Sequence, residues 1–158
     1  MKTLSNILFI GLIIGFLVWT WEQNKKDPVI QDPRIVNIIK DWKNDMSSVG
    51  IDGETLIKRI DRILIVDTIP EGFIDHVSQG QVGKSDHSTR TIWILNRDYE
   101  REYLKALVYH EIGHYLFDLK HEGNGLIMST YIKEEPGYYK QNWDSLLPVY
   151  LEKCRRAK

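Results

Sequence analysis

Two histidines four positions apart, His110 and His114, have the residue type and the spacing needed to bind one metal ion, and Glu111 lies between them. Residues at positions i and i+4 share one face of an α-helix, so both imidazoles can reach the same ion. Glu111 projects to the side of this pair, where its carboxylate can accept a proton from a metal-bound water. This HExxH pattern predicts a zinc site with Glu111 as the general base.

A third histidine, His121, follows His114 by seven positions. On an uninterrupted helix it would lie about 10 Å further along the axis, too far away to bind the same ion. His121 can therefore be a ligand only if the helix ends near Phe117 or Asp118 and the chain folds back. We expect this reversal and interpret His121 as the third ligand.

Acidic residues are the alternatives for the third ligand. Asp118 could serve only if the end of the helix unwinds. Glu134 and Glu135 lie about 20 positions after the second histidine, where some zinc enzymes take a glutamate from a second helix. Pro136 and Gly137 follow at once and disfavour a helix there. The sequence leaves these alternatives open.

A short apolar segment, residues 126–129, follows the third histidine, and its methionine, Met128, lies seven positions after His121. With it the sequence resembles the metzincin class of zinc peptidases, in which an HExxHxxGxxH motif precedes a Met-turn. The resemblance implies that the zinc ligands are His110, His114 and His121. It also implies that Glu111 is the general base and that Met128 is the Met-turn residue.

The spacing departs from the metzincin pattern at two positions, because Phe117 stands where that pattern has glycine and Lys120 where it has the third histidine. The resulting HExxHxxxxxxH spacing is more similar to a group of small zinc metallopeptidases with an "IMS"-type turn. The resemblance covers roughly residues 60–143. It implies peptide-bond hydrolysis by a zinc-bound water that Glu111 activates.

The resemblance also implies an α+β fold, in which a few-stranded sheet packs on the active-site helix, followed by the Met-turn and a C-terminal helix. Related enzymes sometimes place an oxyanion-stabilising tyrosine after the Met-turn, and the candidates are Tyr131, Tyr138 and Tyr139. The other histidines, His76 and His87, fall in a polar segment and are expected to face solvent.

Local patterns predict the elements that position these residues. Asp32 and Pro33 suit the start of a helix whose apolar positions continue to Met46, and Asp98 suits the cap of the active-site helix. β-Branched runs predict strands, and the strand over residues 91–95 is expected to be an edge with which an extended substrate pairs. The elements expected from these patterns are a helix over 34–46, a strand over 57–66, a loop or weak hairpin over 73–90, a strand over 91–95, a helix from 99 and a helix from 142.

The first 21 residues have a different character from the rest of the chain. Residues 4–21 are almost entirely apolar, end in Trp19 and Trp21, and are followed by Lys25 and Lys26. This favours an uncleaved membrane anchor over a cleaved signal peptide, which would leave the protein secreted. We expect an anchor over 1–21, a linker over 22–33 and a catalytic domain over 34–158 on the extracytoplasmic side.

Composition limits the classes of function. The chain has 158 residues and a formal net charge of −1, which argues against a broadly basic nucleic-acid binder. Its single cysteine excludes an intrachain disulfide. The expected partners are a peptide or protein substrate and a membrane, and the oligomeric state is left open. A non-catalytic zinc-binding module, or a zinc hydrolase acting on a non-peptide substrate, is the alternative function.

Overall fold

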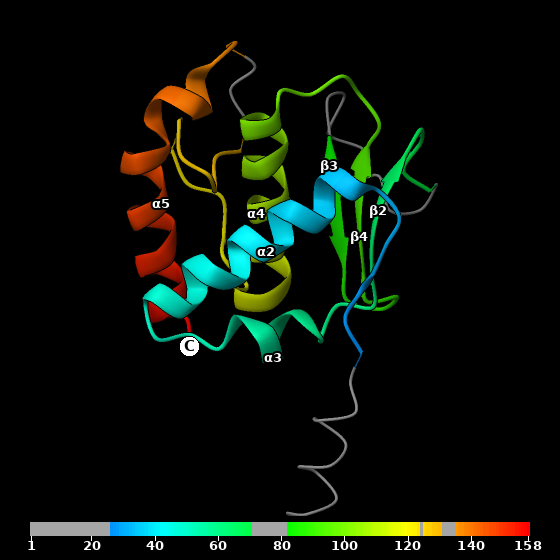
Figure 1. The fold of residues 1–158 in the computed structure, drawn as a ribbon, viewed down its shortest axis with the longest axis horizontal. Coiled ribbons are helices and arrows are strands. Elements are labelled where there is room, and N and C mark those ends of the chain that lie inside the picture. The colour runs from blue at the N-terminus through cyan, green and yellow to red at the C-terminus, as the bar shows by residue number, and fades with distance from the viewer. Residues whose placement is uncertain (1–25, 71–81, 124, 131–134) are drawn as a thin grey trace, which may run out of the picture.

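A computed structural model describes residues 26–70, 82–123, 125–130 and 135–158 (Figure 1). These residues form a mixed α+β fold with a four-stranded sheet and four helices, which confirms the predicted class at this level. In chain order the elements are β1 (Val29–Ile30), α2 (Pro33–Ser48), α3 (Gly53–Ile57), β2 (Arg62–Val66), β3 (Gly83–Asp86), β4 (Thr91–Leu95), α4 (Arg101–Phe117) and α5 (Tyr138–Arg156).

The sheet has the strand order β1-β2-β4-β3. Neighbours among β1, β2 and β4 are parallel, whereas β3 and β4 form an antiparallel hairpin. The expectation that residues 91–95 form a free edge is therefore wrong. Ile92 pairs with Ile63 on one side and with Ser85 on the other, because residues 83–86 fold back beside β4. On this side of the described sheet the outermost strand is β3.

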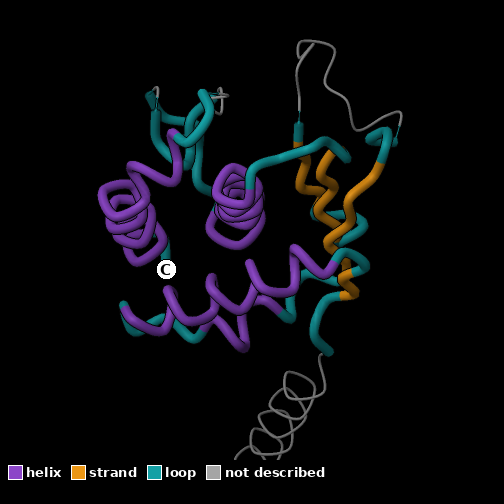
Figure 2. Tube along the Cα trace, turned by 45° about the horizontal axis from the view of Figure 1, so that its top comes forward, coloured by secondary structure: helices purple, strands orange, loops and turns teal. Residues whose placement is uncertain are grey.

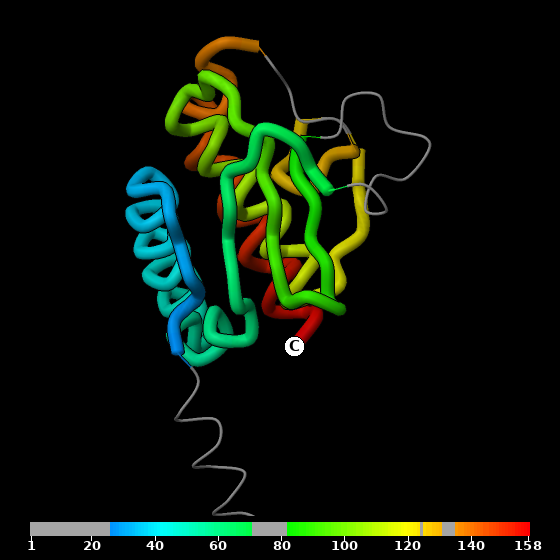
Figure 3. Tube along the Cα trace, turned by 90° about the vertical axis from the view of Figure 1, so that its right-hand side faces the viewer, coloured from blue at the N-terminus to red at the C-terminus, as the bar shows by residue number. Residues whose placement is uncertain are grey.

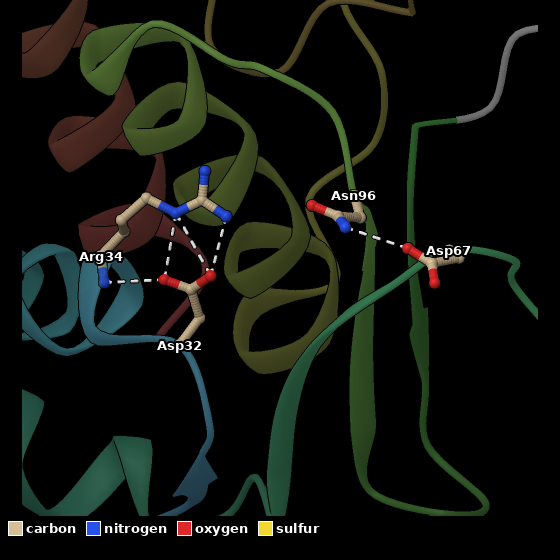
Figure 4. Close-up of polar contacts among 4 residues, drawn as sticks. All are labelled: Asp32, Arg34, Asp67 and Asn96. Atoms are coloured by element: carbon tan, nitrogen blue, oxygen red, sulfur yellow. Dashed lines mark hydrogen bonds and ion pairs between the residues drawn. The ribbon is translucent and has the colours of Figure 1, made fainter.

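The ends of β2 and β4 are joined by polar contacts (Figure 4). The Asn96 amide side chain donates a hydrogen bond of 2.9 Å to the Asp67 carboxylate, and the Asn96 backbone N–H donates to the Val66 carbonyl at 2.7 Å. Both contacts lie just before the chain enters α4. They fix the direction in which the chain leaves the sheet toward the helix that carries the histidine pair.

Helix α2 confirms the helix predicted over 34–46. The Asp32 carboxylate accepts a hydrogen bond of 2.8 Å from the Arg34 backbone N–H and also pairs with the Arg34 guanidinium (Figure 4). Pro33 occupies the first turn, where its missing N–H costs nothing. The buried face consists of the apolar residues at helical spacing, Ile35, Ile38, Ile39, Trp42 and Met46.

Helix α4 lies at the centre of the fold. It packs against β3 and β4, against α5 and against α2. Seen nearly end-on in Figure 2, it lies between α5 and the strands, while α2 crosses beneath both helices. Its buried residues consequently occur on all its sides. Among them are His110 and Glu111, each only 5% exposed. Polar side chains are rarely buried to this degree unless they have partners.

The start of α4 differs from the prediction. The helix begins at Arg101 rather than Tyr99, and Asp98 is exposed instead of capping it. Glu100 occupies the cap position without a side-chain capping bond. Its carboxylate instead accepts a hydrogen bond of 2.9 Å from the Gly137 N–H, just before α5. A contact between distant parts of the chain has replaced the local cap.

Other predicted boundaries also shift. Residues 57–66 were expected to be one strand, but Ile57 ends the short helix α3, which Asp52 caps through the Thr55 N–H at 3.0 Å. The strand begins only at Arg62. The C-terminal helix starts at Tyr138, about one turn before residue 142. Val29–Ile30, within the expected linker, pairs with β2 as strand β1.

Within the described residues, no helix combines the length and the apolar character needed to cross a membrane. The anchor predicted over residues 1–21 lies outside the described part of the chain.

Candidate metal centre

The last turns of α4 carry the histidine pair. His110 and His114 are one turn apart on the same helical face, and their rings meet with the two Nε2 atoms 3.0 Å apart. The centroids of the rings lie 4.5 Å from one another. This confirms that the HExxH spacing brings both imidazoles to one point.

The chain reverses directly after α4. The helix ends at Phe117, and Asp118 adopts the left-handed conformation with φ 51°. The N–H groups of Asp118 and Leu119 donate to the last helical carbonyls, those of His114 and Gly113, both at 3.2 Å. The helix therefore ends where the sequence required it to end if His121 was to reach the pair.

His121 completes a triangle of nitrogen atoms. Its Nε2 lies 3.0 Å from the Nε2 of His114 and 3.2 Å from the Nε2 of His110. Within the described part of the chain, these three residues form the one group of histidine, cysteine or acidic side chains able to hold a metal ion. Glu135 is exposed and not part of this group, and Glu134 lies outside the described residues.

Backbone carbonyls determine which nitrogen of each buried ring carries the proton. The Nδ1–H of His110 donates to the Ile127 carbonyl at 2.7 Å, and the Nδ1–H of His114 donates to the Leu119 carbonyl at 2.6 Å. A carbonyl only accepts, so in the neutral rings the proton is on Nδ1 and Nε2 carries a lone pair. Two lone pairs thus face each other at 3.0 Å, an arrangement that a cation between them stabilises.

Burial keeps the imidazoles neutral. It lowers the pKa of His110 to about 3. The hydrogen bond to Ile127 raises this pKa to a smaller extent, and the neighbouring histidines lower it further. Burial also lowers the pKa of His114 and, although His121 is more exposed, that of His121. Metal binding requires unprotonated imidazole, so near pH 7 these nitrogens are available as ligands.

Glu111 projects toward β3 and not into the nitrogen triangle. Burial raises the pKa of its carboxyl to about 8, partly offset by the positive charge of Lys84 and by a hydrogen bond from the Ser85 hydroxyl. A Cβ atom built on Gly83 would lie only 2.6 Å from Glu111 Oε1. The backbone of β3 thus approaches the carboxylate as closely as a residue without a side chain allows.

Met128 lies beneath the histidine-bearing turn of α4. It is 1% exposed, and a Cβ atom built on Gly113 would lie 2.8 Å from its Sδ atom. The glycine of the HExxH segment is therefore what allows the 126–129 turn to pack so close to the helix. In this position Met128 forms part of the floor of the site, and its neighbour Ile127 supplies the carbonyl that orients His110.

The tyrosine candidates differ in their surroundings. Tyr139 is 2% exposed and packs edge-on against Tyr103, with ring centroids 5.9 Å apart. The Tyr138 hydroxyl donates a 2.8 Å hydrogen bond to the Gly125 carbonyl, in the loop before the methionine. Tyr131 lies outside the described residues. The Tyr138 hydroxyl therefore holds a loop, and Tyr139 belongs to the core.

The remaining histidines do not join the centre. His87 is exposed, as expected, and stacks on Tyr115 with ring centroids 4.5 Å apart. His76 lies outside the described residues.

Two contributors to the site were missed by the reading of the sequence, Gly83 and Ser129. Gly83 lies 28 positions before Glu111, and nothing in the local pattern links the two. In the sequence, Ser129 stands out only as part of the apolar turn. It is 0% exposed, and both the donor and the acceptor of its hydroxyl are used within the loop that holds His121. The serine that directly follows Met128 in the "IMS"-type turn was the available signal.

Comparisons of the chain with known protein families, with curated proteins and with solved structures found no match.

Proposed function

We propose that this protein is a zinc-dependent peptidase of the kind that the metzincin resemblance implies, anchored to a membrane by residues 1–21. One observation carries the proposal: three Nε2 atoms, those of His110, His114 and His121, converge within 3.2 Å of one another beside a buried Glu111. Metal ligands and an adjacent carboxylate are the two components that hydrolytic zinc centres share.

The nitrogen triangle suits zinc in its dimensions. Three imidazoles bound tetrahedrally at about 2.05 Å would have nitrogens about 3.3 Å apart. The separations of 3.0 to 3.2 Å require an outward movement of only a few tenths of an ångström. Neutral imidazole is also a ligand that zinc prefers, although copper, nickel and iron accept it too. The donor set therefore fits zinc, and metal analysis can test this identity directly.

The residues around the centre have distinct roles in the proposed reaction. When bound, zinc would polarise a peptide carbonyl and make water easier to deprotonate. Glu111 accepts the proton of the attacking water and then delivers it to the leaving amine. A nearby cation favours the ionised form of Glu111, opposing the burial that raises its pKa. The Ser85 hydroxyl and the charge of Lys84 favour ionisation as well.

A catalytic centre explains Glu111 better than a purely structural metal site does. Structural zinc sites normally use four protein ligands, whereas the described residues here supply three. A metal-binding module without turnover has no need for a buried carboxylate beside the ligands. Burying one is costly because the charged form is desolvated, and carboxyls with such perturbed pKa values cluster at functional sites. This contrast favours hydrolysis over metal storage.

Strand β3 is the part of the sheet best placed to meet a substrate. It is the outermost strand on its side of the described sheet, and its backbone at Gly83 lies against the Glu111 carboxylate. An extended peptide laid beside β3 would pass close to the proposed general base. A peptide substrate is thus compatible with the position of the centre, which supports peptide hydrolysis over hydrolysis of other substrates.

The Glu111→Gln variant tests the proposal. Glutamine keeps the volume of the side chain and one acceptor oxygen but cannot accept the proton, so we expect bound zinc to remain and peptide cleavage to fall by at least about 100-fold. The measurement is zinc per chain by elemental analysis, followed by cleavage of a peptide library with and without a chelator.

Two outcomes would contradict the proposal. Wild-type cleavage by Glu111→Gln would remove Glu111 from the reaction. Zinc-loaded wild-type protein that cleaves no member of a broad peptide library would favour the non-catalytic module or a non-peptide substrate. Glu135→Gln is the matched control, since Glu135 is exposed and outside the metal group, and it should cleave normally.

A further inference from the structure

The Ser129 hydroxyl joins the two segments that complete the metal centre. It donates a 2.8 Å hydrogen bond to the Gly123 carbonyl and accepts one of 2.7 Å from the Leu126 N–H. These directions are fixed, because a carbonyl only accepts and an amide N–H only donates. Ser129 is 0% exposed, so water does not compete for either bond. The loop around the buried hydroxyl therefore uses both its donor and an acceptor lone pair.

Each end of this bridge lies close to a component of the centre. Gly123 comes two residues after His121, and Leu126 comes directly before Ile127, whose carbonyl accepts the His110 Nδ1–H at 2.7 Å. A single hydroxyl thus connects the backbone that carries one ligand to the backbone that orients another. Loss of the bridge would affect both.

The His121 segment depends on such backbone contacts because its residues are not buried in the core. Residues 120–123 are all exposed. Among the other contacts that restrain them, the Glu122 N–H donates to the Met128 carbonyl at 2.8 Å, and the Glu122 carboxylate pairs with Lys153 on α5. The ion pair is solvent-accessible, with side chains 49% and 23% exposed, so solvent screens it. The Ser129 bridge is the buried side-chain restraint.

We propose that Ser129 is a positioning residue of the metal centre, whose hydroxyl holds the His121 loop against the Met128 turn so that His121 and the oriented ring of His110 meet at one ion. The proposal rests on metal binding by the three histidines and is independent of peptide cleavage. Ser129 acts through the loop and does not touch the metal.

The test is the metal affinity of Ser129→Ala in the full chain. Groups that orient metal ligands typically contribute 10- to 100-fold to affinity, and we expect a loss of zinc affinity in that range, measured by competition with a chromophoric chelator. Cobalt loaded in place of zinc should show weaker visible bands, because solvent that replaces a displaced His121 raises the coordination number. His121→Ala provides the spectrum of the centre without its third ligand.

Two further variants separate positioning from general damage. Ser129→Thr keeps the hydroxyl and should recover most of the affinity that alanine loses. Ser145→Ala removes another hydroxyl–carbonyl bond, the 2.8 Å bond to Asn142 on the exposed side of α5, and should bind zinc as wild type does. Metal-free thermal stability measured for all variants shows whether Ser129→Ala has acted on the fold instead of on the site.

The outcomes are distinguishable. Wild-type zinc affinity in Ser129→Ala, or equal losses in the alanine and threonine variants, would overturn the positioning role while leaving the proposed peptidase intact. A wild-type chain that binds zinc but cleaves no peptide would overturn the peptidase while the affinity series still reports on Ser129. A wild-type chain that binds no zinc would overturn both.

Discussion

Glu111 is held in a space that depends on the absence of a side chain on the neighbouring strand. Gly83 is buried in β3, and a Cβ there would lie 2.6 Å from Oε1 and 3.0 Å from Cδ of the glutamate. Contacts this short cannot persist, and the carboxyl group is the more movable partner. At the scale of single residues, Gly83 therefore sets where the proposed general base can be.

Gly83→Ala should displace Glu111 without disturbing the histidines. A shift of about 1 Å in a catalytic group can cost roughly 100-fold in rate, and we expect a loss of this order in kcat/KM with unchanged zinc content. The measurement is peptide cleavage alongside metal analysis. Glu111→Asp is the matched background, since its shorter side chain retreats from β3. In the Glu111→Asp background, Gly83→Ala should cause little further loss of kcat/KM. A further loss as large as that in the wild-type background would contradict the steric explanation.

The residues of the centre were predictable to different degrees from the sequence. The helical period alone brings His110 and His114 together, and the structure confirms it. The groups that orient these rings are the carbonyls of Ile127 and Leu119, which every residue type possesses and no sequence pattern reveals. Gly83 escaped prediction for a related reason, because its role depends on a contact across 28 positions of chain.

At the scale of elements, the reversal after α4 determines whether His121 joins the pair. Asp118 is in the left-handed region, with φ 51°, and the following carbonyl of Leu119 turns back onto the His114 ring. Left-handed backbone costs an ordinary residue roughly 1–2 kcal/mol, and aspartate, asparagine and glycine tolerate it best. The role of Asp118 is thus to adopt the left-handed conformation at the turn and not to bind the metal.

Substitutions at Asp118 should follow backbone preference and not charge. We expect Asp118→Val to lower stability by about 1–2 kcal/mol and to weaken zinc binding, because a β-branched residue resists positive φ. Asp118→Gly also removes the ion pair with Lys120 but keeps the turn, and should bind zinc normally. Thermal unfolding and chelator competition measure both effects. Equal zinc affinity in the two variants would show that the turn does not position His121.

Elements that depend on local interactions could be predicted from the sequence, whereas the position of a strand in the sheet could not. Helix α2 agrees with its pattern because a local cap and apolar residues at helical spacing define it. Strand β4 agrees because its β-branched and aromatic residues favour a strand. The position of β4 inside the sheet did not follow from residues 91–95. It depends on the neighbouring Gly83–Asp86, a segment with weak strand propensity that pairs because the hairpin brings it there.

At the scale of the whole molecule, hydrogen bonds in the core connect the helix that carries the histidine pair to α2 and α5. Tyr150 of α5 donates a 2.8 Å hydrogen bond to the Tyr109 carbonyl, beside His110, and accepts one of 3.3 Å from Trp42 of α2. Figure 3 shows α2 along one side of the sheet, and Figure 1 shows α5 on the other side of α4 from the strands. Helices α2, α4 and α5 are thus linked through one buried hydroxyl that bonds to the residue before His110. Metal binding should consequently stabilise the fold as a unit.

Cys154, the only cysteine, can report on this coupling, because it is 0% exposed and burial raises the pKa of its thiol to about 12. It should react with iodoacetamide only when the core opens. Zinc at about 100 times its Kd favours the folded state by about 2.7 kcal/mol, so alkylation should slow about 100-fold if opening is in rapid equilibrium. The rate is measured by mass spectrometry with and without zinc. His110→Ala should show no slowing, whereas a wild-type rate indifferent to zinc would show that α5 opens independently of the centre.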